Sequence, residues 1–205
     1  MSSELRVTAP LPDARCCLKA RSRSPRSSVL VELAEGESVR RAEFSDRALL
    51  QNFVCTDPSR KHRERGYVRT HPTPWELDVQ SNLRNLRPPF RDDSEGLTVL
   101  VRGGKLVSAA HFGYSTDGEA VIVFSLAVSI DERGQGYGGY LLRTVLGELE
   151  RQDPDAPVFA RIDDRNDSSQ ALFGGLGFER TEERDAQEVA LRLWTYTHPF
   201  TVQPA

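Results

Sequence analysis

The sequence predicts one α/β domain behind an N-terminal tail, on three observations. The chain has 205 residues, which suits one domain with a full hydrophobic core and is short for two. Segments with the two-residue alternation of strands are interleaved with segments that have the periodicity of helices. Four glycines within residues 134–139 lead straight into one of these helices.

The first half of the chain predicts one strand and two helices. Residues 28–33 are rich in β-branched and apolar side chains and predict a strand, and residues 44–55 carry the apolar stripe of a helix. Residues 56–74 contain several prolines and a basic cluster, and they predict an exposed loop. A second helix should begin at Pro74, because proline suits the first helical position. Its apolar stripe consists of Trp75, Val79, Leu83 and Leu86.

The second half predicts a hairpin, a central strand and further alternating elements. The Gly103-Gly104 pair lies between two strand-like runs and is typical of a two-residue hairpin turn. Residues 120–130 are apolar on both faces, which predicts a strand in the centre of the sheet. The helix after the glycines has its apolar stripe at Leu142, Val145, Leu146 and Leu149. Then follow a predicted strand over 157–162, a short helix over 168–178 and a last strand over 188–198.

Charge separates the tail from the rest of the chain. Residues 1–27 hold six basic and two acidic side chains, a balance of +4, which leaves −7 for the remainder of the net charge of −3. We therefore expect a disordered basic tail over residues 1–27, a domain over residues 28–200 and a short C-terminal tail over residues 201–205. An acidic domain argues against a nucleic-acid partner and favours a cationic small substrate.

Other composition signals exclude several classes of protein. No run of about 18 apolar residues is present, so no membrane partner is expected. The first residues lack the apolar core of a secretory signal, and the cytosol, hence a cytoplasmic protein, is the expectation. The cysteines, Cys16, Cys17 and Cys55, lack the paired spacing of a zinc site, and no metal is expected.

The glycines at the start of the helix predict a phosphate site. The first N–H groups of a helix lack partners inside it, and they lie at the positive end of the helix dipole. Gly134, Gly136 and Gly139 also satisfy the G-x-G-x-x-G pattern of dinucleotide-binding folds. Three residues separate them from the preceding apolar strand, however, and only 66 residues follow Gly139. A dinucleotide site with Asp163 or Asp164 on the ribose therefore stays a minor alternative, and the absence of Gly-Lys-Ser/Thr excludes a P-loop.

The same glycines fit a second pattern better. The segment Arg133–Gly138, RGQGYG, matches Arg/Gln-x-x-Gly-x-Gly/Ala, and residues 166–178 read NDSSQALFGGLGF. These two motifs resemble the pyrophosphate loop and the second motif of the GNAT superfamily of N-acetyltransferases, which use acyl-CoA. The resemblance covers roughly residues 97–198. It implies a central mixed, mostly antiparallel sheet of about six to seven strands, flanked by about four helices, with a V-shaped splay between the central strands.

The resemblance also implies where the acetyl-CoA lies. Main-chain groups of Ala127, Val128 and Ser129 would bind the thioester and the pantetheine arm. The pyrophosphate would lie on the N–H groups of Arg133, Gly134, Gln135, Gly136, Tyr137, Gly138 and Gly139. Asn166 would hydrogen-bond the arm, although it is about equally suited to cap a helix. Arg133 would add charge or remain solvated, and Tyr137 and Tyr140 would stack on the cofactor or pack in the core.

The reaction implied is direct attack of an amine on the acetyl thioester in a ternary complex. An alkylammonium must first lose a proton, but no carboxylate lies within residues 121–130, and Glu119 and Asp131 are the nearest. The second motif places Phe173 beside the sulfur, where the family often has a tyrosine that protonates the thiolate. Tyr114 or Tyr196 could donate instead, or the thiolate could leave unaided.

The acceptor is expected over the two early helices and the last strands, where His62, His71 and Trp75 occur. A lone histidine is more often structural than catalytic, so neither histidine is expected to take part in the chemistry. The acceptor is an amine of a small molecule or a protein, and the oligomeric state is left open with a homodimer as one option. The missing tyrosine and carboxylate leave a non-catalytic acyl-CoA-binding domain as the alternative function.

Overall fold

The computed structural model describes residues 31–32, 36–57, 71–91, 94–184 and 190–196, and these form one eight-stranded sheet with its helices. The strands are β1 (Val31–Glu32), β2 (Glu37–Arg41), β3 (Glu95–Arg102), β4 (Lys105–Tyr114), β5 (Val121–Val128), β6 (Val158–Asp163), β7 (Glu179–Arg184) and β8 (Leu191–Tyr196). The helices are α1 (Arg47–Gln51), α3 (Pro74–Asn85), α4 (Tyr137–Gln152) and α5 (Asp167–Gly174), with the 3-10 turns η1 (Phe44–Asp46) and η3 (Ile130–Glu132). Both predicted tails lie outside the described residues.

The strand order is β1-β2-β3-β4-β5-β6-β8-β7, and β5 with β6 is the parallel pair among the described strands. The predicted mixed, mostly antiparallel sheet is therefore confirmed. The hairpin is also confirmed, because Gly103 and Gly104 both have positive φ, +53° and +75°, as a two-residue turn between β3 and β4 requires. Two strands, β2 and β7, were not predicted.

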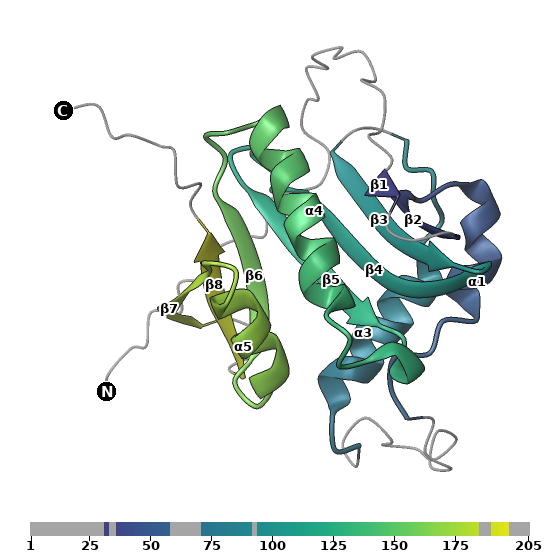
Figure 1. Ribbon diagram of the computed structural model, residues 1–205. Helices are drawn as coiled ribbons and strands as arrows, with labels where there is room; N and C mark the ends of the chain where they lie inside the picture. The colour runs from purple at the N-terminus through teal and green to yellow at the C-terminus, as the bar shows by residue number, and fades with distance from the viewer. Residues whose placement is uncertain (1–30, 33–35, 58–70, 92–93, 185–189, 197–205) are drawn as a thin grey trace, which may run out of the picture.

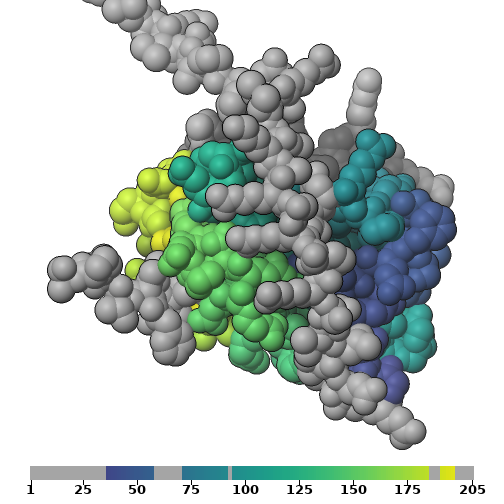
Figure 2. Space-filling model, turned by 90° about the horizontal axis from the view of Figure 1, so that it is seen from above, coloured from purple at the N-terminus to yellow at the C-terminus, as the bar shows by residue number. Residues whose placement is uncertain are grey.

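The sheet separates two hydrophobic cores. Helix α4 covers one face, where Leu142 and Val145 pack on β4 and β5, and helices α1 and α3 cover the other, where Leu50 and Leu83 are fully buried (Figure 1). Seen from above, β2 and α1 lie on one flank of the molecule, β7 and β8 lie on the other, and α4 lies between them (Figure 2). No helix in the described part of the chain combines the length and apolarity needed to cross a bilayer.

The predicted helices occur, with one change of role. Helix α3 begins at Pro74 as expected, and Leu83 of its stripe is fully buried. Trp75 is not a core residue, since its ring lies 5.1 Å from the Arg165 guanidinium, between α3 and the loop after β6. The helix predicted over residues 44–55 is shorter and consists of η1 and α1, ending at Gln51.

A buried ion pair joins β2 to the start of α1. Asp46 is 1% exposed, accepts hydrogen bonds of 2.5 and 2.8 Å from the Arg40 guanidinium, and accepts a third from the Glu43 N–H at 2.8 Å. Burial opposes the charge on the carboxylate, but these hydrogen bonds outweigh it and hold the pKa of Asp46 below its ordinary value.

We expect Asp46→Ala to lower the free energy of unfolding by about 1–3 kcal/mol at pH 7, because Arg40 and the Glu43 N–H lose their acceptor. The contribution of Asp46 is present above the ordinary carboxyl pKa of about 4, and it is lost as the pH falls through the lowered folded-state pKa. Urea unfolding of both proteins between pH 7 and pH 3 measures this. A difference that stays constant down to pH 3 would assign the loss to packing and not to the charge.

Candidate active site

The central parallel strands separate after a short pairing. β5 and β6 pair over Val121–Val158, Ile122–Phe159 and Val123–Ala160, yet β5 continues to Val128 and β6 to Asp163. On its other edge β5 stays paired with β4 as far as Val128. The predicted splay is therefore present (Figure 1), and it leaves the edge of β5 beyond Val123 without a paired strand on the β6 side. We call this unpaired stretch the β5–β6 opening.

Hydrogen bonds to β4 show which main-chain groups face this opening. The Ser108 hydroxyl donates to the Ala127 carbonyl at 2.8 Å, and the Ser129 N–H donates to a β4 carbonyl at 2.8 Å. Main-chain groups of successive strand residues point to alternate edges, so Leu126 and Val128 direct theirs towards β6. The main-chain groups of Ala127 and the Ser129 N–H, both expected to bind the cofactor, therefore face β4. Those of Val128 and of Leu126, which was not among the predicted residues, face β6.

The glycine loop forms the start of α4 at the open end of the splay. Gly134 and Gly136 have φ of +78° and +83°, a left-handed backbone that favours glycine, and a Cβ at either position would lie in open space. Gly136 is the N-cap of the sixteen-residue helix α4, and no side chain caps this end. The N–H groups of the first turn therefore remain for an anion.

The loop's own side chains are bonded within the protein. Arg133 donates to Glu76 on α3 at 2.8 Å and to the Cys55 carbonyl, and Gln135 donates to Glu132 at 3.0 Å. The Tyr137 hydroxyl accepts from Arg102 at 2.5 Å and donates to Glu37 at 3.2 Å. These contacts anchor both ends of the loop to neighbouring elements. Tyr137 thus has a structural partner, and Arg133 would have to leave Glu76 to reach a phosphate.

The next residues pack the helix against its neighbours. A Cβ on Gly138 would lie 3.2 Å from a methyl of Leu172 and 3.3 Å from a methyl of Val128, so the absence of a side chain lets α4 approach β5 and α5 closely. Gly139 has more room, because a Cβ there would lie 3.8 Å from the Arg143 guanidinium. Tyr140 packs against the hydrophobic core between α4 and the sheet, hereafter the α4-side core, which matches the core-packing alternative for this tyrosine.

The two residues of the second motif have structural contacts. Asn166 is the N-cap of α5, and its Oδ1 accepts the Ser169 N–H at 3.1 Å, which matches the capping alternative. Phe173 is 4% exposed and meets the Phe178 ring edge-on with centroids 4.9 Å apart. Neither contact excludes a bound cofactor nearby, and their part in cofactor binding stays a prediction.

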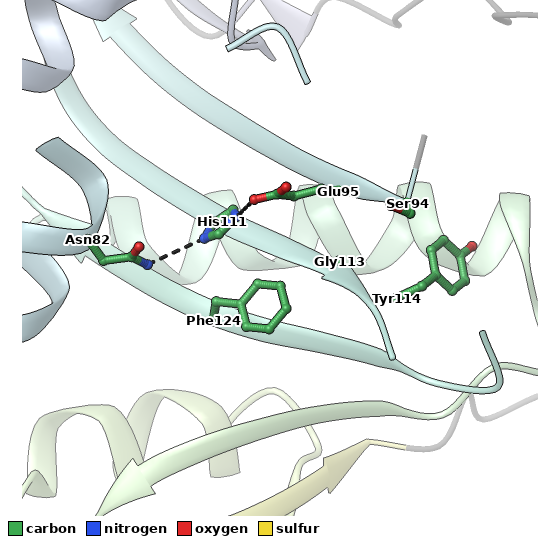
Figure 3. Close-up of a pocket in the computed structure, with 7 residues that line it drawn as sticks. All are labelled: Asn82, Ser94, Glu95, His111, Gly113, Tyr114 and Phe124. Atoms are coloured by element: carbon green, nitrogen blue, oxygen red, sulfur yellow. Dashed lines mark hydrogen bonds and ion pairs between the residues drawn. The ribbon is translucent and has the colours of Figure 1, made fainter. Parts of the chain in front are cut away.

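A pocket of about 360 Å³ lies on the α3 side of the sheet, lined by Asn82, Ser94, Glu95, His111, Gly113, Tyr114 and Phe124 (Figure 3). His111 Nε2 and Glu95 Oε1 are 2.6 Å apart, and Asn82 lies on the other side of the imidazole, 3.4 Å from Nδ1. Neither Glu95 nor His111 was predicted from the sequence. A signal was present, because His111 is a polar residue at a buried position of an apolar strand.

The other expected acid–base candidates are dispersed. Tyr114 lines the pocket, whereas Tyr196 packs on Phe178 with ring centroids 5.2 Å apart, and burial raises its pKa. Glu119 and Asp131 are exposed and do not line the pocket. His71 is buried and accepts the Thr73 N–H at 3.1 Å, and His62 lies outside the described residues. Among the residues with assigned positions, no three His, Cys, Asp or Glu side chains could hold a metal ion together.

Three solved structures with a similar fold are named as acetyltransferases. The ribosomal-protein-S5-alanine acetyltransferase from Vibrio fischeri is 14% identical with a TM-score of 0.58, over 84% of this chain and 98% of that one. The ribosomal-protein-S18-alanine N-acetyltransferase from Escherichia coli is 18% identical with a TM-score of 0.55, over 82% and 98%. The PaiA N-acetyltransferase from Thermoplasma acidophilum, solved in complex with coenzyme A, is 9% identical with a TM-score of 0.55, over 78% and 98%.

The sequence itself identifies the family. No curated protein matches the chain significantly. Residues 59–178, more than half of the chain, match the family model described as the Acetyltransferase (GNAT) family. The splayed sheet and the similar structures agree with that match. The chain therefore belongs to the GNAT family of acetyltransferases, transferases that acylate amines.

Proposed function

We propose that the protein transfers an acetyl group from acetyl-CoA to a primary amine of a small molecule or a protein, by direct attack in a ternary complex. The observation that carries this proposal is the opening between β5 and β6, which ends at the uncapped start of α4. Unpaired main-chain groups along β5 suit the amides of a pantetheine arm, and the helix start suits a pyrophosphate.

In this proposal, two parts of the site hold the cofactor. The N–H groups from Gly134 to Gly139 would hold the pyrophosphate, since the loop is exposed and no side chain caps the helix. Leu126 and Val128 would bind the arm, as their main-chain groups point towards β6. Asn166 and Phe173 lie at the start and the end of α5. The cap uses Asn166 Oδ1, so the Nδ2 group of Asn166 would be the donor to the arm.

Direct attack is supported by the state of the thiol in the described part of the chain. Cys55 is buried, and burial raises its pKa to about 11, so the thiol stays protonated at neutral pH. A protonated, buried thiol is a poor nucleophile for an acyl-enzyme intermediate. This supports attack of the amine on the thioester itself, in which the C–N bond forms and the C–S bond breaks. The similar structures are named for acting on ribosomal-protein alanines, which supports an amine acceptor.

The proposal is tested by thiol release. Acetyl-CoA is incubated with the protein, with and without a mixed panel of primary amines, and free coenzyme A is measured with a thiol reagent. We expect release that depends on both the protein and the amine. Binding of coenzyme A by calorimetry without amine-dependent release would favour a non-catalytic acyl-CoA-binding domain, and the absence of binding would overturn the proposal.

A further inference from the structure

The pocket of Figure 3 adjoins the point at which β5 leaves β6. Val123 is the last β5 residue paired with β6, and Phe124, the next residue, lines the pocket. A β-bulge lies here, because β4 pairs His111 with Ser125 and Phe112 with Val123, which leaves Phe124 without a partner. A bulge redirects a side chain, and the Phe124 ring is 46% exposed with its centroid 5.0 Å from that of His111. The pocket therefore lies beside the start of the β5–β6 opening.

Charge in this pocket is concentrated on one carboxylate. The Glu95 side chain is 40% exposed, whereas that of His111 is 7% exposed. The carboxylate is therefore accessible from the pocket, and the buried imidazole hydrogen-bonds to it. Oε1 accepts the bond from His111, which leaves Oε2 as the oxygen turned to a ligand. The Phe124 ring adds an aromatic wall. A carboxylate beside an aromatic ring suits an organic cation.

The imidazole is held in one orientation between two polar partners. Asn82 donates to the Ser125 hydroxyl at 2.7 Å, and the same amide nitrogen faces His111 Nδ1. With Nδ1 as acceptor, Nε2 carries the proton and donates to Glu95. Burial lowers the pKa of His111 and Glu95 opposes this, with the net result below the ordinary value. At neutral pH the pair therefore carries one negative charge.

The groups that face His111 from the packed elements are few. β3 contributes Glu95, and Tyr114 of β4 lines the same pocket. β5 contributes Ser125 and Phe124, neither of which titrates near neutrality. Helix α3 contributes Asn82, and Phe90, in the segment after α3, stacks on the imidazole with ring centroids 5.8 Å apart. Among the described residues that line the pocket, none is a Lys or Arg that would compete with a bound amine for Glu95.

We propose that this pocket receives the acceptor as a primary alkylammonium, and that the ammonium proton passes to the Glu95–His111 pair, entering at the Glu95 carboxylate. This inference rests on the proposed acetyl transfer. After the proton has moved, the nitrogen lone pair attacks the thioester carbon, the C–N bond forms and the C–S bond breaks. The second proton lost by nitrogen goes to the departing thiolate, and the pair returns its proton to solvent. Glu95 meets the substrate, and His111 positions it.

Binding is tested first, with n-butylammonium as the probe and the protein saturated with coenzyme A at pH 7. The imidazole ¹H–¹⁵N resonances of His111 are assigned by comparison with His111→Gln, and they should shift when the probe is added. In Glu95→Gln, affinity for the probe should fall at least tenfold. Glu119→Gln is the matched comparison, because it removes the same charge from an exposed carboxylate in the loop between β4 and β5. We expect it to bind as the wild type does. If the His111 resonances do not shift when n-butylammonium is added, the pocket is not the binding site and the proposal is overturned.

Kinetics then separate proton transfer from binding. For the wild type, kcat/KM for n-butylamine should stay level between the pKa of the pair and that of the amine, because the ammonium is the species used. In Glu95→Gln it should fall at least tenfold at pH 7 and follow the free amine, changing about tenfold per pH unit below the amine pKa of about 10. Affinity for coenzyme A should be equal in all variants.

The two proposals fail differently. A wild type that neither binds coenzyme A nor releases thiol from acetyl-CoA would overturn the proposed function. A wild type that does both, beside a Glu95→Gln variant with the same amine affinity, kcat/KM and pH profile, would overturn this site alone. A fall in amine affinity and kcat/KM in Glu119→Gln but not in Glu95→Gln would also overturn this site, because the proton acceptor would then lie in the loop between β4 and β5.

Discussion

Gly136→Asp should weaken coenzyme A binding by one to two powers of ten, and each power corresponds to about 1.4 kcal/mol. Gly136 is the N-cap of α4, and its added side chain would enter open space where the pyrophosphate should lie. The aspartate carboxylate would occupy the positive end of the helix and repel the phosphates. Isothermal titration with coenzyme A measures the change.

The matched control is Gly118→Asp. Gly118 also has positive φ, +75°, and a Cβ there would likewise meet open space, so the substitution introduces the same backbone strain and the same charge. It lies in the turn before β5, at the opposite end of that strand from the glycine loop. We expect both variants to remain folded and only Gly136→Asp to lose affinity. Equal affinities in two folded variants would place the pyrophosphate elsewhere.

The glycine loop, the helices beside it and the hairpin could be predicted because local sequence encodes them. Positive-φ glycines, a proline at the first helical position and an apolar stripe each act over a few residues, and α3, α4 and the hairpin follow from them. The parallel pairing of β5 with β6, and so the splay, came from the family resemblance. Whether the main-chain groups of Ala127 or of Leu126 face β6 could not be predicted, because the bulge at Phe124 changes which residues face that edge.

The missed strands lack the pattern on which strand prediction depends. β7 reads ERTEER, with five charged residues in six, and it is the edge of the sheet, paired with β8 on one side. Charged side chains are common on an edge strand because solvent reaches them, so no apolar alternation marks it. β2, ESVRR, has one buried residue, Val39, and is similarly weak in sequence.

The pocket could not be predicted because the register between β3 and β4 brings its residues together. Leu97 pairs with His111 across β3 and β4, which makes Glu95 a diagonal neighbour of His111 on the same face. Asn82 comes from α3, 29 residues before His111. No spacing in the sequence relates these three positions. His111 is a polar residue in an otherwise apolar strand, which indicates an unusual position but does not identify the residues that contact it.

Phe173→Ala should lower the free energy of unfolding by about 3–5 kcal/mol, the usual loss when a buried aromatic ring is removed. Phe173 is 4% exposed, meets Phe178 edge-on and belongs to the α4-side core. Phe44→Ala is the control, since that ring is 68% exposed and its contact is with the Arg47 guanidinium at 4.3 Å. It should lose no more than about 1 kcal/mol. Urea unfolding of the three proteins measures both values.

Phe173→Tyr decides whether the ring also borders the sulfur of the cofactor. A hydroxyl that stays within the core and finds no partner should cost about 1–3 kcal/mol and leave kcat unchanged. A hydroxyl that reaches the departing thiolate should instead raise kcat severalfold, since a well-placed general acid is worth about 10²-fold or more. Melting curves and steady-state rates of the same preparation separate these results. If Phe173→Ala kept both its stability and its coenzyme A affinity, residues 166–178 would have no part in the core or the site, and the cofactor assignment would depend on the glycine loop and the β5–β6 opening alone.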